Sequence, residues 1–461
     1  MTTERLLQRT CEIASTYLAA VRDLPVGSSV QYETLLHTMG GPLPITLTDP
    51  LQIIEDLAEQ ARPGLVTTPG PRHFGFVIGG VLPAALAADW LASTWDQNAF
   101  SFVLSPAATV VEEIARQWLV ELLGLSPDVS LGVVTGGTMG NFTALAAARH
   151  ALLVGAGWNV EEQGLFGAPE ITVVTSEESH ITIFASLQML GMGRARVTRV
   201  AADDQGRMLP DALAAVLRGT RTPPLVCAQA GNVNTGAFDP ISDIASLVRN
   251  AGGWLHVDGA FGAWAAASPE LRGLTSGLEL ADSLSVDGHK WLNVPYDCGF
   301  VFVRDREAHR AAMTLEAPYY VPAPSVARAN HNWVPEASRR ARGFAVYAAL
   351  RSLGRDGLAE LIERCARLAR RMAARLASGP GIRILNDVVL NQVLVRFEGA
   401  DADARTAAVI RRVQADGTCW VGGTTWKGMH PMRVSVSNWS TTERDIDQSA
   451  DAIVRCAALE D

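Results

Sequence analysis

Several common sequence signals are missing from this chain of 461 residues. It has no long basic run and a net charge of −9, so neither nucleic acids nor acidic membranes are expected partners. The N-terminus spreads charges among apolar residues and has no signal-peptide core. The longest apolar stretch, 74–88, is broken by glycines and Pro83 and is too short to span a bilayer. These absences predict a cytoplasmic protein that binds no membrane.

Cysteine is also scarce. The six cysteines form no C-x-x-C pair, which is expected of reduced thiols rather than of a disulfide framework. We therefore predict neither disulfides nor a metal site. What the chain does contain is a globular composition, with 48% hydrophobic and 19% charged residues, and its length suggests two or three domains.

The middle of the chain has the sequence pattern of an α/β protein. From about residue 131, short β-branched runs alternate with Ala- and Leu-rich helical stretches, which predicts a mostly parallel sheet covered on both faces. The run GFVFVR follows its predecessor too closely for a crossover helix, so we expect it to run antiparallel. The predicted strands are 131–135, 171–175, 224–230, 253–258, 282–287 and 299–304.

The flanking regions are predicted to be mainly helical. The segment 305–340 is rich in Pro, Tyr, Asn and Arg and lacks periodicity, so we expect a long functional loop there. A smaller C-terminal α+β domain is expected after it, with strand-like runs at 384–398 and 432–438. The predicted helices are 4–21, 50–60, 106–124, 141–153, 210–218, 341–378 and 402–416.

In an open parallel sheet, ligands bind beyond the carboxyl ends of the strands, so the residues after each strand sample the site. TGGTMGN at 135–141 offers backbone N–H groups and Thr138 at a helix N-terminus, where a phosphate is favoured. It is neither a Walker loop nor a G-x-G-x-x-G motif, and a plain tight turn is the alternative. SEESH ends at His180, which taken alone is equally compatible with an ordinary core or loop histidine.

Two ionisable residues complete this pattern. Asp258 ends a run that should be buried, so it must be paired or neutral; it either caps a turn or keeps a ring nitrogen protonated. Lys290 follows the next strand, and a partly desolvated lysine is a candidate Schiff-base former, whereas a lone lysine is usually solvated. A phosphate turn, a histidine, an acid and a lysine at successive strand ends together predict a pyridoxal phosphate site.

At this point the chain resembles the group II pyridoxal-phosphate-dependent decarboxylases, which include aromatic L-amino acid and glutamate decarboxylases. The resemblance covers most of the chain, and HVDGA and D-x-HKW are its most specific blocks. It implies the type I, aspartate aminotransferase-like fold, with a mostly parallel seven-stranded sheet in a large domain. The implied domains are an N-terminal helical segment packing on the partner subunit (1–90), a cofactor domain (91–340) and a small α+β domain (341–461).

The resemblance also implies roles for single residues. Lys290 would be the lysine bound to the cofactor, Asp258 the partner of the pyridine nitrogen, and Ala260 and His180 the contacts on the two ring faces. Either of two asparagines would lie near the phenolic oxygen. The implied cofactor-binding residues are Gly137, Thr138, His180, Asn232, Asn234, Asp258, Ala260, His289 and Lys290. Asp287 departs from the asparagine of the aromatic decarboxylases, and a carboxylate there would repel a phosphate.

The implied reaction is decarboxylation of an L-amino acid to the amine and CO2, through an external aldimine and a quinonoid. The Phe and Trp content near the proposed pocket favours an aromatic or apolar substrate. Phe74, Phe100 and Arg433 are candidate substrate contacts. The segment around 96–106 crosses between protomers in the family, which implies a homodimer with shared active sites.

Several residues are candidates for the acid that donates a proton to Cα. Alignment on Trp333 places Asn330 where the aromatic decarboxylases have a catalytic tyrosine, so His331, Tyr319 or Tyr320 would have to donate the proton, unless the longer loop aligns differently. Loss of that acid resembles the change in aldehyde-forming relatives. The alternatives are therefore a decarboxylative oxidative deaminase, a carbon–carbon lyase, an aminotransferase, or a non-catalytic relative that keeps the fold.

Overall fold

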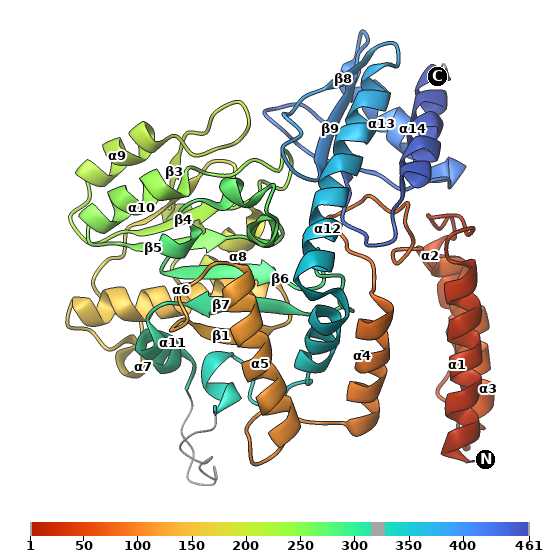
Figure 1. Cartoon of the computed structure of the whole chain (residues 1–461), viewed down its shortest axis with the longest axis horizontal. Coiled ribbons are helices and arrows are strands. Elements are labelled where there is room, and N and C mark those ends of the chain that lie inside the picture. Colours follow the sequence, from red (N-terminus) through yellow and green to blue (C-terminus); the bar gives the residue numbers. More distant parts are fainter. Residues whose placement is uncertain (1, 315–327, 460–461) are drawn as a thin grey trace. The chain divides into compact units, whose positions relative to one another are not determined.

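The computed structural model describes residues 2–314 and 328–459 (Figure 1). The chain divides into two compact units. Unit 1 consists of Met1–Ile78, Arg371–Leu385 and Leu394–Asp461, and unit 2 of Gly79–Arg370 and Asn386–Val393. The predicted division at residues 90 and 340 stays a prediction.

Unit 2 contains a seven-stranded sheet with the order β1-β7-β6-β5-β4-β2-β3. β7 is antiparallel to both of its neighbours and the other strands are parallel to one another, which confirms the predicted sheet and the reversed run. β3 was missed because it has three residues, two of them exposed. The strands are β1 (Ser130–Val134), β2 (Val173–Ser176), β3 (Thr198–Val200), β4 (Leu225–Gln229), β5 (Trp254–Asp258), β6 (Ser283–Asp287) and β7 (Gly299–Val303).

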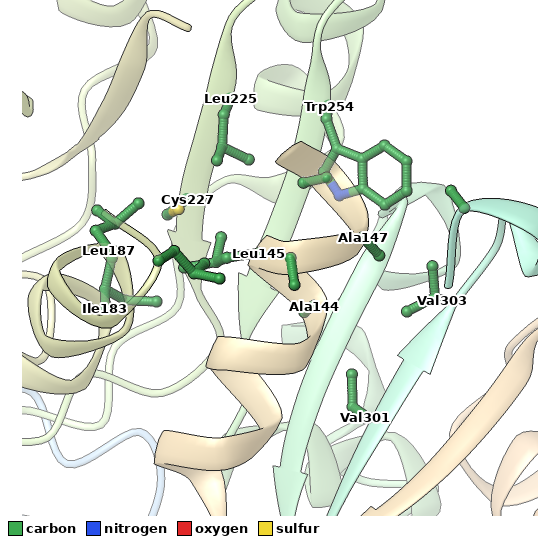
Figure 2. Close-up of a cluster of buried hydrophobic side chains, with 14 of the residues drawn as sticks. Ala144, Leu145, Ala147, Ile183, Leu187, Leu225, Cys227, Trp254, Val301 and Val303 are labelled. Carbon is green, nitrogen blue, oxygen red and sulfur yellow. The ribbon is translucent and has the colours of Figure 1, made fainter. Parts of the chain in front are cut away.

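Both faces of this sheet are covered. Leu225 and Val226 are consecutive residues of β4 whose side chains point to opposite faces, and both are fully buried. One face packs against α6 (Gly137–Gly155) and α8 (Ile181–Met189), as Figure 2 shows for residues such as Leu145 and Ile183. Each fully buried aliphatic side chain contributes about 1.5–3 kcal/mol relative to exposure, so α6 is held firmly on the sheet.

The predicted helices of unit 2 are present, and further helices lie between them. α5 begins where Ser105 accepts a hydrogen bond from the Ala108 N–H and Pro106 fixes the first turn. The segment 305–340 was predicted to be a loop, but its first part is α11, capped by Asp305, so the prediction was wrong there. The helices are α4 (Pro83–Trp95), α5 (Pro106–Leu122), α7 (Val160–Gln163), α9 (Pro210–Arg218), α10 (Ile241–Asn250), α11 (Arg306–Met313) and α12 (Gly343–Ala377), which continues into unit 1.

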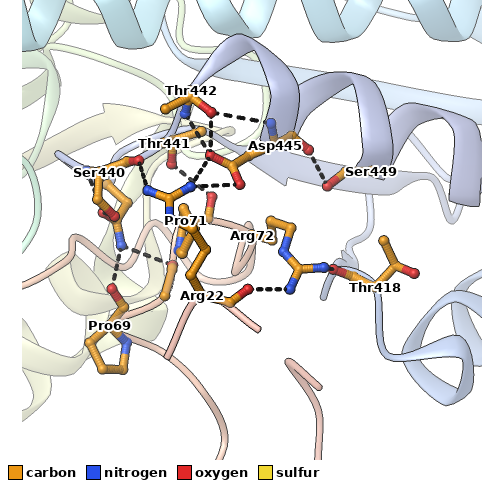
Figure 3. Close-up of polar contacts among 12 residues, drawn as sticks. Arg22, Pro69, Pro71, Arg72, Thr418, Ser440, Thr441, Thr442, Asp445 and Ser449 are labelled. Atoms are coloured by element: carbon orange, nitrogen blue, oxygen red, sulfur yellow. Dashed lines mark hydrogen bonds and ion pairs between the residues drawn. The ribbon is translucent and has the colours of Figure 1, made fainter. Parts of the chain in front are cut away.

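Unit 1 joins the N-terminal helices to a four-stranded sheet and the C-terminal helices. Figure 3 shows Arg22 donating to both Asp445 carboxylate oxygens, at 3.0 and 2.8 Å, and Arg72 donating to the carbonyl of Thr418. Asp445 also completes the capping box of α14 with Thr442. The elements are α1 (Thr3–Ala20), α2 (Tyr32–Met39), α3 (Pro50–Ala61), β8 (Ile382–Ile384), β9 (Gln392–Phe397), α13 (Ala402–Asp416), β10 (Gly422–Gly423), β11 (Met432–Ser435) and α14 (Glu443–Ala458).

Among the helices that the structure describes, none is both long and apolar enough to cross a membrane. All six cysteines lie in the described part of the chain and are free thiols.

Candidate active site

Lys290 is one of only two lysines in the sequence, the other being Lys427. It lies in a turn directly after β6, and this turn is closed by the N–H groups of Gly288 and His289, which donate to the Cys298 carbonyl at 3.0 and 3.1 Å. A Cβ atom on Gly79 would lie 1.8 Å from the Lys290 carbonyl oxygen, so only glycine allows this approach. The turn is therefore fixed from two sides.

The Lys290 amine has a buried counter-ion. Lys290 Nζ lies 2.9 Å from Oδ2 of Asp287, whose side chain is 3% exposed against 20% for Lys290. Asp287 Oδ1 is buried without a hydrogen-bond partner, and His289 Nε2 is 3.6 Å away. Burial lowers the pKa of His289, although Asp287 opposes this shift. Lys290 is thus the basic side chain that lies closest to the Asp287 carboxylate, at 2.9 Å against 3.6 Å for His289.

The glycine-rich turn before α6 lies next to the Lys290–Asp287 ion pair. The first hydrogen bond of the helix runs from Gly140 N–H to the Gly136 carbonyl at 2.8 Å, so the preceding N–H groups are oriented to receive an anion. A Cβ atom on Gly137 would lie 3.1 Å from Asp287 Oδ2, and one on Gly136 would lie 2.7 Å from His289. Gly137, Thr138 beside it, His289 and Lys290 are therefore brought together at one sheet edge.

Asp258 ends β5 and is paired in register with Ser285 of β6. Its Oδ1 accepts a hydrogen bond from the Ala260 N–H at 3.1 Å, and its Oδ2 accepts one from Asn141 Nδ2 at 3.0 Å. The same Nδ2 lies 3.0 Å from the Thr182 hydroxyl, which in turn lies 2.8 Å from His180 Nδ1 at the start of α8. Asp258, Ala260 and His180 are thus linked through a short chain of hydrogen bonds.

One of the two asparagines after β4 is held within its own loop. Asn232 is fully buried, and its Oδ1 accepts hydrogen bonds from the N–H groups of Asn234 and Thr235 at 2.8 and 3.2 Å. Its Nδ2 donates to the Glu178 carbonyl at 3.3 Å. Asn232 therefore shapes its own loop.

The proton-donor candidates fall in one short segment. His331 stacks on Phe100 with ring centres 4.1 Å apart, and its Nδ1 lies 3.2 Å from the Phe100 carbonyl; burial lowers its pKa. Asn330 is fully buried, and its Nδ2 donates to the Thr109 hydroxyl at 3.4 Å. Tyr319 and Tyr320 lie outside the described residues.

Phe74 and Arg433, the other predicted substrate contacts, belong to unit 1. Phe74 is 1% exposed, and its backbone bonds to the Trp420 carbonyl and the Ser435 N–H, both at 2.9 Å. Arg433 lies on β11, where burial lowers its pKa to about 10. Their roles stay predictions.

An amine, a carboxylate and an anion-binding turn are the groups that a phosphorylated aldehyde with a basic ring nitrogen requires. Unit 2 supplies all three at the carboxyl ends of parallel strands, where such sheets bind ligands. The buried, unpartnered oxygen of Asp287 beside the turn shows that this edge is built for charge rather than for apolar packing. Within the described residues, no cluster of three or more His, Cys, Asp or Glu side chains is arranged to hold a metal ion.

Comparison with known proteins identifies the family of this chain. Residues 37–398 match the family model of the pyridoxal-dependent decarboxylase conserved domain, so the chain belongs to this family. An L-2,4-diaminobutyrate decarboxylase of Rhizobium meliloti (strain 1021) is 32% identical over 94% of this chain and 88% of its own length. An aromatic-L-amino-acid decarboxylase of Bacillus atrophaeus is 27% identical over 82% of this chain and 78% of its own.

The fold is shared with solved structures. The crystal structure of Oryza sativa TDC with pyridoxal phosphate and tryptamine matches with a TM-score of 0.92 and 23% identity, covering 98% of this chain and 97% of that one. The type I fold predicted from the sequence is therefore confirmed. Family membership also confirms the predicted enzyme class, a carboxy-lyase, and the cofactor, pyridoxal phosphate.

Sequence reasoning missed three residues that shape the site: Gly79, Thr182 and Asn141. The scarcity of lysine was an unused signal. A chain with two lysines offers only two side-chain amines that could bind an aldehyde. Asn141 ends the TGGTMGN motif and lies four residues after Gly137, hence one turn further along α6. Its partners on other elements become visible only in the folded chain.

Proposed function

We propose that this enzyme converts an L-amino acid with an aromatic or apolar side chain to the amine and CO2. The observation that carries the proposal is the position of Lys290, one of two lysines, against buried Asp287 and the turn at Gly137. When bound, pyridoxal phosphate supplies an aldehyde that reacts with amines and a ring that takes up electrons from Cα. The residues of this chain must hold that group, keep its ring nitrogen protonated and return a proton to Cα.

Lys290 Nζ is the amine assigned to the cofactor, and Asp287 is its counter-ion in the cofactor-free protein. Asp258 holds a proton on the ring nitrogen, because a carboxylate fixed by two donors is ready to accept a third. Ala260 contacts one ring face and His180 the other. We assign Gly137, Thr138 and His289 to the phosphate, as the N–H groups at the start of α6 favour an anion.

Asn234 is our candidate for the phenolic oxygen of the cofactor, since the Asn232 amide is occupied within its own loop. Phe74 and Phe100 are proposed to contact the substrate side chain, and Arg433 its carboxylate. The similarity to an aromatic-L-amino-acid decarboxylase supports this substrate class. The higher identity to an L-2,4-diaminobutyrate decarboxylase supports a second candidate, a basic amino acid.

His331 is our candidate for the acid that returns a proton to Cα. Asn330 offers no acidic proton and is bonded to Thr109 in the interior. This environment favours the alternative in which the enzyme forms an aldehyde. If no acid reaches Cα, the enzyme would act as a decarboxylative oxidative deaminase and release an aldehyde. Similarity to a phenylacetaldehyde synthase of Arabidopsis thaliana supports keeping this alternative.

We further propose a cytoplasmic homodimer with shared active sites, in which the segment 1–90 packs on the partner subunit. The helices α1, α2 and α3 contain no buried residue, and Leu43, Ile45 and Leu47 are at least 90% exposed. Such an apolar surface is expected to be covered by another protein surface. The six free thiols support a reducing compartment.

The experiment is product analysis over a panel that includes L-tryptophan, L-phenylalanine, L-glutamate and L-2,4-diaminobutyrate. We expect CO2 and the amine from an aromatic substrate. CO2 from diaminobutyrate alone would reject the substrate class but retain decarboxylation. Aldehyde with hydrogen peroxide or a keto acid would reject decarboxylation to the amine, and a carbon–carbon lyase or aminotransferase would likewise be recognised by its products.

Lys290→Ala with Lys427→Ala as its matched control tests the lysine. Borohydride treatment of the enzyme with pyridoxal phosphate should label wild type and Lys427→Ala, and leave Lys290→Ala unlabelled. Labelling of the Lys290→Ala protein would contradict the assignment.

A further inference from the structure

We propose that Asn141 is a positioning residue that fixes Asp258 and His180 together through its single amide group. This inference rests on the proposed roles of these two side chains at the cofactor ring. Asn141 lies on α6 and is fully buried. Its side chain contacts residues of β5, β6 and α8, so it connects three elements that each carry part of the site.

The orientation of the Asn141 amide is determined by chemistry. The Asp258 carboxylate lies 3.0 Å from Asn141 Nδ2, and an ionised carboxylate only accepts hydrogen bonds. Nδ2 must therefore face Asp258, and Oδ1 must act as an acceptor. Oδ1 accordingly accepts from the Ser285 hydroxyl and lies 3.0 Å from His256 Nε2. Every polar atom of this amide is thus used.

The same reasoning fixes the proton on His256. Its Nε2 must donate to Asn141 Oδ1, which leaves Nδ1 as an acceptor from the Ser283 hydroxyl at 3.0 Å. Ser283 in turn accepts from the Trp254 indole N–H at 2.9 Å, so its own proton is available for His256. Burial lowers the pKa of His256 to about 4, which keeps the ring neutral, as this pattern requires. In this series of hydrogen bonds, each group donates to the next, from the Trp254 indole to the Asp258 carboxylate.

A second branch reaches His180. The other Nδ2 hydrogen of Asn141 is directed at the Thr182 hydroxyl, 3.0 Å away, and that hydroxyl lies 2.8 Å from His180 Nδ1. The Thr182 backbone N–H also points at His180 Nδ1, at 3.4 Å, so Nδ1 is an acceptor. In the neutral imidazole the proton therefore resides on Nε2. One amide group thereby sets the position of Asp258 and the tautomer of His180.

The physical consequence is that neither side chain can reorient independently. Rotating the Asn141 amide would place its oxygen against the Asp258 carboxylate and leave the Ser285 and His256 donors without an acceptor. A buried polar group without a partner costs about 1–3 kcal/mol. The Asp258 carboxylate and the His180 ring are consequently held in place before any ligand arrives, which is the preorganisation that such a site requires.

The decisive variant is Asn141→Asp, which has the same shape but loses both amide hydrogens. Two carboxyl groups within hydrogen-bonding distance share a proton, so the charge of Asp258 is reduced. We expect pyridoxal phosphate, titrated into the cofactor-free protein, to bind about tenfold more weakly, and the pH midpoint of its visible absorption band to shift by about one unit. Ser285→Ala removes one donor to Oδ1 but leaves the His256 donor and both amide hydrogens in place, so it is the matched control and should change both readouts less than Asn141→Asp does.

Thr182→Val separates the two branches, because it interrupts the link to His180 and leaves Asn141 bonded to Asp258. We expect kcat to fall about tenfold with KM and the absorption midpoint unchanged, and Thr182→Ser to restore kcat. A folded Asn141→Asp protein with the wild-type cofactor affinity and midpoint would overturn the proposal. If that variant does not fold, a wild-type kcat in Thr182→Val would overturn it instead. Because cofactor affinity and the absorption band are read without substrate, they decide the role of Asn141 even if no amino acid is decarboxylated.

Discussion

At the scale of single residues, the charge of Asp287 should control how readily the cofactor binds. Its carboxylate forms an ion pair with the Lys290 side chain at 2.9 Å and lies beside the turn assigned to the phosphate. A Schiff base forms from the neutral amine, and a phosphate is repelled by a nearby carboxylate. Asp287→Asn removes both obstacles. We expect pyridoxal phosphate to bind roughly 5- to 30-fold more tightly, on the order of 1–2 kcal/mol.

The measurement is a cofactor titration of the apoenzyme followed by absorbance. Asp282→Asn is a matched control, because Asp282 lies at the other end of β6 and bonds to the Leu255 N–H. Its cofactor affinity should equal that of wild type. Weaker binding in Asp287→Asn would instead mean that the carboxylate helps to hold the cofactor.

These residues also mark how far the sequence could predict the site. Lys290, Asp258 and His180 were predictable because the residues after parallel strands converge on one sheet edge. Asp287 was recognised as unusual, but its contact with Lys290 depends on the turn that follows β6. Asn141 could not be predicted, since its role is defined by hydrogen-bond partners up to 144 residues away in sequence.

At the scale of elements, a buried ion pair connects α5 with the segment before α12. Arg339 Nη2 lies 2.6 Å from Glu112 Oε2, and both side chains are 1% exposed. Removing Arg339 leaves the buried Glu112 charge with only the more distant Arg328. Arg339→Met should therefore lower the free energy of unfolding by about 3–5 kcal/mol in urea titrations.

The neighbouring arginine provides the control. Arg340 pairs with Asp89 at 2.8 Å, but its side chain is 39% exposed. Arg340→Met should cost about 0–1 kcal/mol. The double variant Glu112→Leu/Arg339→Met should recover most of the loss, because it removes both buried charges. Equal effects of the two single arginine substitutions would contradict this explanation.

Secondary structure was predicted best where the sequence pattern is long. Helices such as α12 and strands such as β4 were recognised by sustained periodicity or by apolar runs. The helix α11 was missed because the segment around it lacks such a pattern, and its buried face includes His309, a polar residue. His309 is buried because it bonds to Ser130 and to the Trp333 carbonyl, contacts that exist only after folding.

At the scale of the whole molecule, buried ionisable groups determine how stability depends on pH. In unit 2, burial lowers the pKa of His256 to about 4 and that of His309 to about 3, from an ordinary value of 6.5. The unfolded chain therefore takes up these protons first as the pH falls. Their contribution to stability is complete above pH 6.5 and is lost as the pH falls toward 4.

Asp239 acts in the opposite direction. Burial raises its pKa to about 7 from 3.8, although the N–H groups of Met208 and Gln229 donate to its carboxyl oxygens. The folded state thus holds a proton that the unfolded chain releases, and the associated stability is complete below pH 3.8 and is lost as the pH rises toward 7. Between pH 4 and 6.5 these histidines, together with His73 of unit 1, whose pKa burial lowers to about 4, take up protons on unfolding, whereas Asp239 releases one.

Each proton taken up corresponds to about 1.4 kcal/mol per pH unit, so the unfolding free energy of the cofactor-free enzyme should fall as the pH falls from 6 to 4.5. Asp239→Asn removes the opposing group. It should lower stability overall, since the amide accepts at only one of its two polar atoms, and it should steepen the slope by about 1.4 kcal/mol per pH unit. Urea titrations at several pH values measure both slopes. Equal slopes in wild type and variant would show that Asp239 is already ionised in the folded protein, and the buried carboxylate would then need a charge partner that its two backbone donors do not supply.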